Sequence, residues 1–84
     1  MMKKNNDNMK RINYSRIFYT TIDKISKVVF RELEKYGVSV EDIKDVGWYR
    51  YGRFSSQPLI VFLKDGRIYK VGTRKGNIYV ERIK

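Results

Sequence analysis

The sequence contains neither cysteine nor histidine. Without cysteine there can be no disulfide, no thiolate metal ligand and no thiol nucleophile. Without histidine the chain lacks the general base of the usual catalytic triads and the commonest metal ligand. Its carboxylates also show no pairing at the spacing that acid and base catalysis requires. We therefore predict a protein that is not an enzyme and that has no metal or cofactor.

Alanine is absent as well, while lysine, isoleucine, asparagine and tyrosine are frequent, which suits an AT-rich genome such as that of a virus or plasmid. Long hydrophobic runs are also missing, because the longest helix-like segment, residues 17–36, has a charged residue every few positions. Such a segment can neither span a membrane nor serve as a secretion signal. We therefore expect a cytoplasmic protein with no membrane partner.

The length of 84 residues limits the chain to one small domain. A domain of this size buries only about 60% of the surface of its unfolded chain, so its stability is marginal. Residues 1–13 have low hydrophobicity and cannot bury enough apolar surface to offset the entropy lost on ordering. We predict that residues 1–13 form a flexible basic arm and that residues 14–84 form a single α+β domain.

Basic residues outnumber acidic residues by 19 to 9, which gives a net charge of +10. Residues 46–84 contain nine lysines and arginines but only two acids, whereas residues 17–45 contain five against six. A charge of one sign on the predicted sheet favours polyanions, above all nucleic acid. The plainer interpretation, that the charge only keeps the protein soluble, stays open.

An apolar stripe with spacings of three and four residues predicts a long helix over residues 14–36. The stripe consists of Tyr14, Phe18, Ile22, Ile25, Val29, Leu33 and Tyr36. Gly37 follows and suits the left-handed position after a helix. A short helical turn is predicted next, because Ser39 and Asp42 have the spacing of a capping box.

Three acids, Glu41, Asp42 and Asp45, lie near this short turn. Oxygen ligands of this kind can bind a divalent cation. Acids in a first helical turn also complement the helix dipole. We prefer the second interpretation and predict no metal site here.

Apolar and β-branched segments separated by turn residues predict four antiparallel strands in a meander, over residues 46–54, 58–64, 67–71 and 77–83. Asp65-Gly66 has the residue types of a two-residue type I′ turn, and Lys75-Gly76 is the next turn. The first turn would place Leu63 opposite Ile68, and the second would place Lys70 opposite Glu81. The predicted fold is α+β, with a long N-terminal helix and one short helical turn on one face of a four-stranded sheet.

This register divides the apolar side chains of the sheet between two faces. One face is the predicted core under the helix and consists of Ile60, Phe62, Tyr69, Val71, Ile78 and Val80. The other face exposes an apolar patch, for which we predict an interface made by Leu59, Val61, Leu63 and Ile68. A homodimer or a partner protein could cover this patch, and so could the arm or the short helix of the same chain.

Alternation along the first predicted strand places Trp48 toward the helix, so Trp48 is predicted to lie in the core. Tyr49 and Tyr51 then face outward beside Arg50 and Arg53. Aromatic rings and guanidinium groups in this arrangement can stack on bases and bind phosphates. Tyrosine is also common in strands for packing reasons alone, so both interpretations stay open.

The leading functional prediction is a small, basic, non-enzymatic protein that binds nucleic acid mainly through the phosphate backbone, with DNA a better candidate than RNA. The predicted binding residues are Arg50, Arg53, Lys64, Arg67, Arg74, Lys75, Arg82, Tyr49 and Tyr51 in the sheet and its turns, and Lys3, Lys4, Lys10 and Arg11 in the arm. The alternative is a protein-interaction module with an acidic partner, for example a viral or plasmid factor that inhibits a host protein.

Two short segments resemble parts of known families. Tyr51-Gly52-Arg53-Phe54 is similar to part of the aromatic motif of RNA-recognition domains, which also need a strand before the first helix and a second long helix. Residues 66–71 and 76–80 resemble the opening hairpin of GIY-YIG nucleases, whose catalytic arginine and glutamate lie on helices after the hairpin. The predicted elements lack these parts of both domains, so neither family is assigned.

Overall fold

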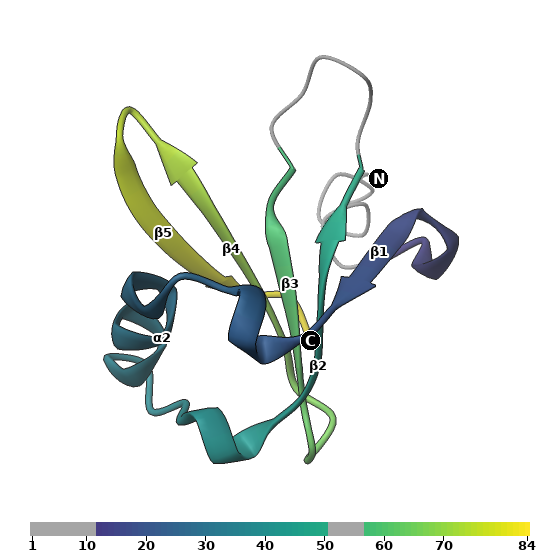
Figure 1. Cartoon of the computed structure of the whole chain (residues 1–84), viewed down its shortest axis with the longest axis horizontal. Helices are drawn as coiled ribbons and strands as arrows, with labels where there is room; N and C mark the ends of the chain where they lie inside the picture. The colour runs from purple at the N-terminus through teal and green to yellow at the C-terminus, as the bar shows by residue number, and fades with distance from the viewer. Residues whose placement is uncertain (1–11, 51–56) are drawn as a thin grey trace, which may run out of the picture.

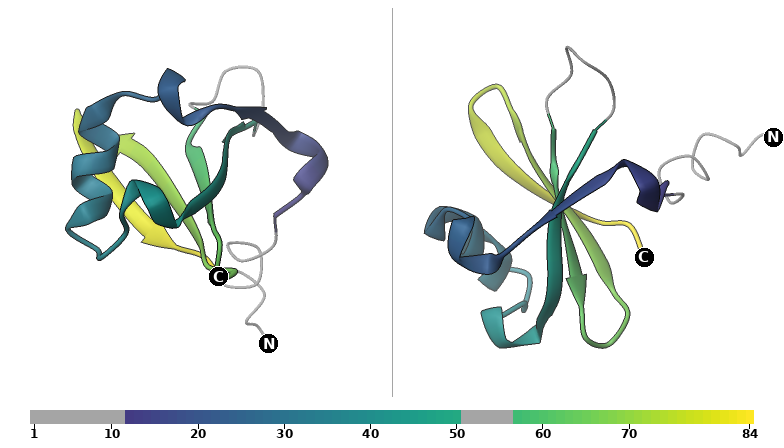
Figure 2. Two further views of the ribbon diagram at one scale, coloured as in Figure 1. Left: turned by 60° about the horizontal axis from the view of Figure 1, so that its bottom comes forward. Right: turned by 45° about the vertical axis from the view of Figure 1, so that its right-hand side comes forward.

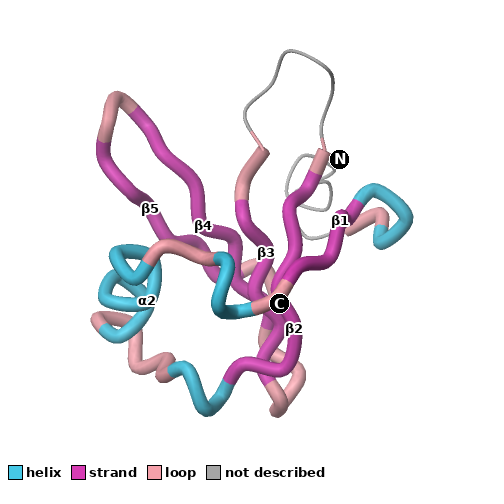
Figure 3. Tube along the Cα trace, viewed as in Figure 1, coloured by secondary structure: helices cyan, strands magenta, loops and turns pink. Residues whose placement is uncertain are grey.

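The computed structural model describes residues 12–50 and 57–84, which form an α+β fold (Figure 1). Five antiparallel strands make one sheet in the order β1-β2-β3-β4-β5, and one α-helix packs on one face beside β5 (Figure 3). The predicted α+β class with an antiparallel sheet is confirmed, but the sheet has five strands instead of four. The elements are η1 (Tyr14–Arg16), β1 (Ile17–Thr20), η2 (Ile22–Lys24), α2 (Lys27–Glu34), η3 (Val40–Asp42), β2 (Ile43–Tyr49), β3 (Leu59–Leu63), β4 (Ile68–Arg74) and β5 (Asn77–Arg82), the η elements being 3-10 helices.

The predicted long helix is wrong over its first half. Residues 17–20 form the edge strand β1, which pairs with β2 and places Ile17 opposite Tyr49. This segment consists of β-branched and aromatic residues, which pack well on a pleated sheet. An apolar spacing of four residues therefore did not distinguish a helix from a strand flanked by 3-10 turns. The helix α2 begins only after Ser26, whose hydroxyl accepts a hydrogen bond from the backbone N–H of Val28.

The end of α2 and the turn after it agree with the sequence. Gly37 has a φ of +82°, and the backbone N–H of Val38 donates to the carbonyl of Leu33, as expected when a glycine ends a helix. The predicted capping box is present at η3, where the carboxylate of Asp42 accepts a hydrogen bond of 3.1 Å from the backbone N–H of Ser39. The helix end depends on one glycine with a positive φ, and the capping box depends on two polar residues three positions apart. Both could therefore be located from the sequence.

The turn between β3 and β4 differs from the prediction by one residue. A type I′ turn needs a positive φ at both central residues. In this turn only Gly66 has one, at +99°. Residues 64–66 form the loop, and Phe62 lies opposite Ile68 instead of Tyr69. The predicted register of this hairpin is therefore wrong by one position.

The turn between β4 and β5 has the predicted geometry. Lys75 and Gly76 have φ values of +54° and +82°, so both central residues are in the left-handed region. The register that follows is also as predicted, with Lys70 opposite Glu81. The Nζ atom of Lys70 lies 3.7 Å from Oε1 of Glu81, and this ion pair stabilises the hairpin across its two strands.

The shift in the first hairpin exchanges the two faces of β3, because a shift of one residue turns every side chain of a strand to the opposite face. Leu59, Val61 and Leu63 are buried in the core together with Leu33 of α2. They were predicted to form an exposed interface, and this placement is wrong. Ile60, which was predicted to lie under the helix, is on the opposite face of the sheet.

The fourth predicted interface residue, Ile68, does lie on the second face, but it is buried there. With Ile60 and Ile83 it forms a second apolar cluster, and Ile12 packs against this cluster. Ile12 was predicted to belong to the arm. Residues of the chain itself therefore cover the apolar patch, and the observation that motivated a homodimer through this face is removed.

The strands twist strongly and spread apart at one end of the sheet (Figure 2). The pairing of β4 with β3 ends where Val71 lies opposite Leu59, and β4 continues beyond this point paired only with β5. We call this end, where β2 ends and β3 begins, the open end of the sheet. It is formed by residues 16–18, 48–50, 57–59 and 72–79.

In the described ranges, no helix is long and apolar enough to cross a membrane.

Replacing Gly47 of β2 tests the position of β1. A Cβ atom at Gly47 would lie 2.5 Å from Cγ2 of Ile17 and 3.0 Å from the carbonyl oxygen of Phe18. We expect Gly47→Ala to lower the free energy of unfolding by about 1–3 kcal/mol, because the backbone of β1 would have to move. Urea unfolding measures this change.

Gly72→Ala is the matched control for this substitution. The three atoms nearest to a Cβ atom at Gly72 would all belong to the phenol of Tyr79, the hydroxyl at 2.8 Å, and a side chain moves more easily than the backbone of a paired strand. We expect Gly72→Ala to cost less stability than Gly47→Ala. Equal effects of the two substitutions would contradict the close packing of β1 on β2.

Candidate nucleic-acid interface at the open end of the sheet

A row of apolar side chains crosses all five strands on the face that α2 packs against. Cross-strand pairing places its members side by side in the order Phe18, Trp48, Leu59, Val71 and Val80. The helix has only eight residues, or about 12 Å, and it packs against β5. It therefore leaves the other end of the row uncovered, where Phe18 is 51% and Trp48 is 36% exposed.

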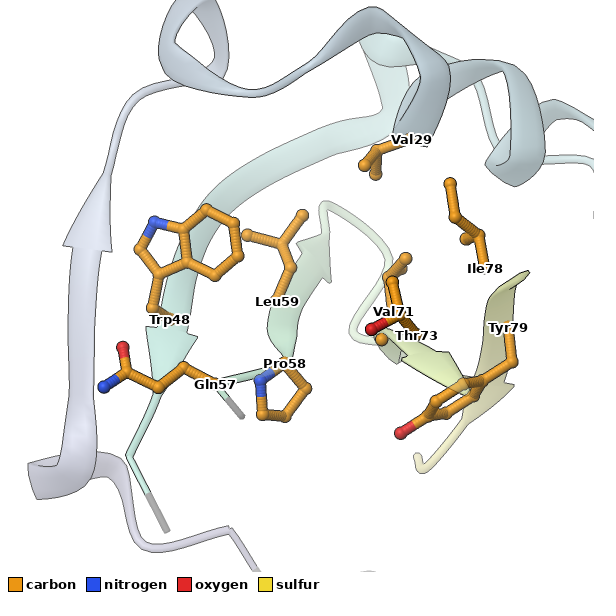
Figure 4. Close-up of a pocket in the computed structure, with 10 residues that line it drawn as sticks. Val29, Trp48, Gln57, Pro58, Leu59, Val71, Thr73, Ile78 and Tyr79 are labelled. Carbon is orange, nitrogen blue, oxygen red and sulfur yellow. The ribbon is translucent and has the colours of Figure 1, made fainter. Parts of the chain in front are cut away.

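A cleft of about 390 Å³ lies between the diverging hairpins beside Trp48. Figure 4 shows Trp48, Pro58 and Leu59 on one side of the cleft, with Thr73, Ile78 and Tyr79 on the other and Val29 of α2 above. We call this the Trp48 cleft. Its walls are mainly apolar, and its polar groups come from Gln57, Thr73 and Tyr79.

The position of Tyr79 in this cleft depends on a glycine in the neighbouring strand. Gly72 lies directly opposite Tyr79, and a Cβ atom at Gly72 would be within 2.9 Å of three atoms of the phenol. Because glycine has no side chain, the ring can lie directly against β4. The ring can thereby line the side of the cleft opposite Trp48.

Two arginines stack on aromatic rings at the open end. The Cζ atom of Arg74 lies 4.3 Å from the ring centre of Tyr79, and that of Arg50 lies 4.5 Å from the ring centre of Phe18. Neither guanidinium forms an ion pair within the described ranges. Stacking on a ring uses the flat face of a guanidinium and leaves its N–H groups at the edge for a ligand.

The charge at the open end has one sign. The segments that form it contain four cations, Arg16, Arg50, Arg74 and Lys75, and no acid. A guanidinium nitrogen of Arg16 donates a hydrogen bond of 2.9 Å to the backbone carbonyl of Arg50, which links the start of β1 to the end of β2. The open end thus combines a positive field with exposed aromatic surface.

The other predicted basic residues lie at the opposite end of the sheet. Lys64 and Arg67 flank the β3–β4 turn, which points away from the β4–β5 turn (Figure 1). Arg67 is held by Asp65, since Nε of Arg67 lies 2.9 Å from Oδ2 of the carboxylate. The Nε atom of Arg82 donates to the backbone carbonyl of Lys84. The structure therefore does not bring the two groups of predicted phosphate-binding residues together.

Acids accompany the cations at this opposite end. The backbone N–H of Lys64 donates to the carbonyl of Asp42, so the acidic turn η3 lies beside the β3–β4 turn. Hydrogen bonds from the backbone and side chain of Arg67 hold the pKa of Asp65 below its usual value. Asp65 is ionised at neutral pH, as an exposed aspartate is, and offsets the charge of its neighbours.

The aromatic part of the prediction needs correction. Trp48 lies on the predicted face but is half-exposed and is not a core residue. Tyr49 is half-buried against the second apolar cluster, and its hydroxyl accepts a hydrogen bond from the backbone N–H of Asn13. Its ring is thus not an outward stacking surface. The remaining predicted binding residues, Tyr51, Arg53, Lys3, Lys4, Lys10 and Arg11, lie outside the described residues.

Sequence reasoning missed the two stacked rings of this site, Phe18 and Tyr79, and also Arg16, Gln57 and Thr73. Phe18 had been assigned to the helix stripe, although the run of β-branched and aromatic residues around it indicated a strand. Tyr79 could have been found from the sequence, because the correctly predicted Lys75-Gly76 turn sets the register that places Tyr79 opposite Gly72. Among the described residues, the acids near η3 and the other potential ligands form no group of three that could hold a metal ion.

Comparison with known proteins yielded no relative. No protein-family model, no curated protein and no solved structure matches this chain significantly. The function is therefore inferred from the site itself.

The single tryptophan offers a direct test of the cleft. Trp48 is half-exposed on the wall of an open cleft, so we expect acrylamide to quench its fluorescence readily in the folded protein. An emission spectrum shifted to the blue, together with protection from acrylamide close to that of a buried indole, would show that Trp48 belongs to the core after all.

Proposed function

We propose that this protein is a non-enzymatic nucleic-acid-binding protein whose binding surface is the open end of the sheet. The observation that supports this most is the pair of arginine and aromatic stacks, Arg50 on Phe18 and Arg74 on Tyr79. Phosphate oxygens bind the edges of guanidinium groups, and nucleobases stack on aromatic rings. The open end offers both kinds of group: the Phe18 stack lies on the face of α2, and the Tyr79 stack lies on the opposite face, because Tyr79 alternates with Ile78 and Val80 of the core.

The sign and distribution of charge favour this end over the other. Four cations without an acid give the open end a field that attracts a polyanion. Each phosphate that replaces condensed counterions adds a favourable, salt-dependent term to the binding free energy. At the opposite end, Asp65 and the acids of η3 would repel the same phosphates. The proposal therefore moves the binding surface away from Lys64, Arg67 and Arg82.

The double substitution Arg50→Gln with Arg74→Gln tests this surface. A hydrogen bond to a charged group contributes about 1.5–3 kcal/mol, and about 1.4 kcal/mol corresponds to tenfold in affinity. We therefore expect the double variant to bind nucleic acid at least about tenfold more weakly at low salt. The slope of log affinity against log salt should fall by about one unit for each phosphate that the variant no longer binds.

The matched control is Lys64→Gln with Lys84→Gln, which removes the same charge at the opposite end of the sheet. All four substituted residues, Arg50, Arg74, Lys64 and Lys84, are exposed. Neither double variant should therefore lose much stability. Equal loss of binding in the two variants would show that net charge alone is responsible. If the wild-type protein binds neither DNA nor RNA at low salt, the basic surface serves an acidic protein partner instead.

A further inference from the structure

The shape of the open end points to one form of nucleic acid. We infer that the Trp48 cleft takes an unpaired base, so that the protein binds single-stranded nucleic acid in preference to duplex. This inference rests on the proposed function and specifies its ligand. In a duplex both faces of each base are covered by its neighbours, whereas a single strand can turn a base out of the stack and into a pocket.

The walls of the cleft suit a flat aromatic ligand. The indole of Trp48 stands on one side and the phenol of Tyr79 on the other, with Leu59 and Val71 between them. Both aromatic groups belong to residues of paired strands: Trp48 lies opposite Leu59, and the ring of Tyr79 lies against Gly72. A volume of about 390 Å³ falls in the range of pockets that bind small organic groups.

The polar groups of the cleft are placed at its rim. The amide of Gln57 and the hydroxyl of Thr73 belong to residues that are exposed, on opposite hairpins. Amide and hydroxyl groups can both donate and accept, so they can pair with the edge of a base. Such hydrogen bonds would position a base without a strict choice among the four.

The two arginines would bind the backbone on either side of that base. Arg50 stacks on Phe18, which neighbours Trp48 in the next strand, while Arg74 stacks on Tyr79 across the cleft. A strand that passes Arg50 on the α2 face would place a base against Trp48 and then continue between the diverging hairpins to Arg74 on the opposite face. Phosphate binding and base stacking would thus act together on one short segment of single strand.

Three probes of equal length separate base recognition from charge. They are a dye-labelled single strand of twelve thymidines, the corresponding duplex, and a strand of twelve abasic deoxyribose phosphates with the same charge. Fluorescence anisotropy measures the affinity of the full chain for each at low salt. Stacking of one base contributes enough for a difference of about fivefold or more. We expect the thymidine strand to bind at least about fivefold more tightly than the abasic strand, and more tightly than the duplex.

Two further measurements locate the base. Binding of the unlabelled thymidine strand should quench the fluorescence of Trp48, whereas the abasic strand should leave it nearly unchanged. Trp48→Leu should reduce the preference for thymidine over abasic strand to near unity while abasic binding persists. The control is Tyr36→Leu, which removes an aromatic side chain that is 51% exposed after α2 and should keep the preference. If circular dichroism shows that Trp48→Leu does not fold, the fluorescence of the wild-type protein is the test. Quenching by the thymidine strand and not by the abasic strand then supports the inference, and equal quenching by both strands overturns it.

The outcomes distinguish this inference from the proposed function. Equal affinity for the thymidine and abasic strands, or tighter binding of the duplex, would overturn the inference but keep nucleic-acid binding. Loss of the base preference in Tyr36→Leu as well as in Trp48→Leu would also overturn it. Failure of all three probes to bind at low salt would overturn the proposed function itself.

Discussion

The close pairing of β1 with β2 determines how much of the sheet the helix can cover. Gly47 allows the backbone of β1 to approach β2, and the chain then needs residues up to Ser26 before a helix can begin. The eight residues left for α2 cover the β5 side of the sheet and leave Trp48 and Phe18 exposed. The exposed aromatic surface is thus a direct consequence of the extra strand.

Much of the fold could be predicted from residues with narrow backbone requirements. Gly37 after the helix and Gly76 in the last turn were located correctly, because glycine adopts a positive φ more readily than other residues. Asp65-Gly66 has a similar sequence to Lys75-Gly76, but in this turn only the glycine has a positive φ. The loop is one residue longer than the predicted two-residue turn. That single residue reversed the faces of β3. Local turn signals therefore identified the hairpins but did not fix the register of both.

The candidate site was predictable in its chemistry and not in its position. Composition alone indicated a basic surface, and Arg50 and Arg74 were among the predicted binding residues. The same rule also selected Lys64 and Arg67, and the structure shows that the acids of η3 lie beside them. The predicted meander already implied their separation from Arg74, because consecutive turns of an antiparallel meander lie at opposite ends of the sheet. Charge counts therefore indicate a polyanion as the candidate partner, and the structure groups Arg50 and Arg74 at one end of the sheet.

The central claim is that residues 17–20 form a strand on β2 and not the start of a helix. Nuclear Overhauser effects between backbone protons test it most directly, because facing residues of an antiparallel pair bring their Cα atoms to about 4.5–5.5 Å. We predict cross-peaks between Tyr19 and Gly47 and between Ile17 and Tyr49, with extended chemical shifts over residues 17–20. Sequential helical cross-peaks continuing without a break from residue 14 to residue 36, without cross-peaks to β2, would contradict the claim.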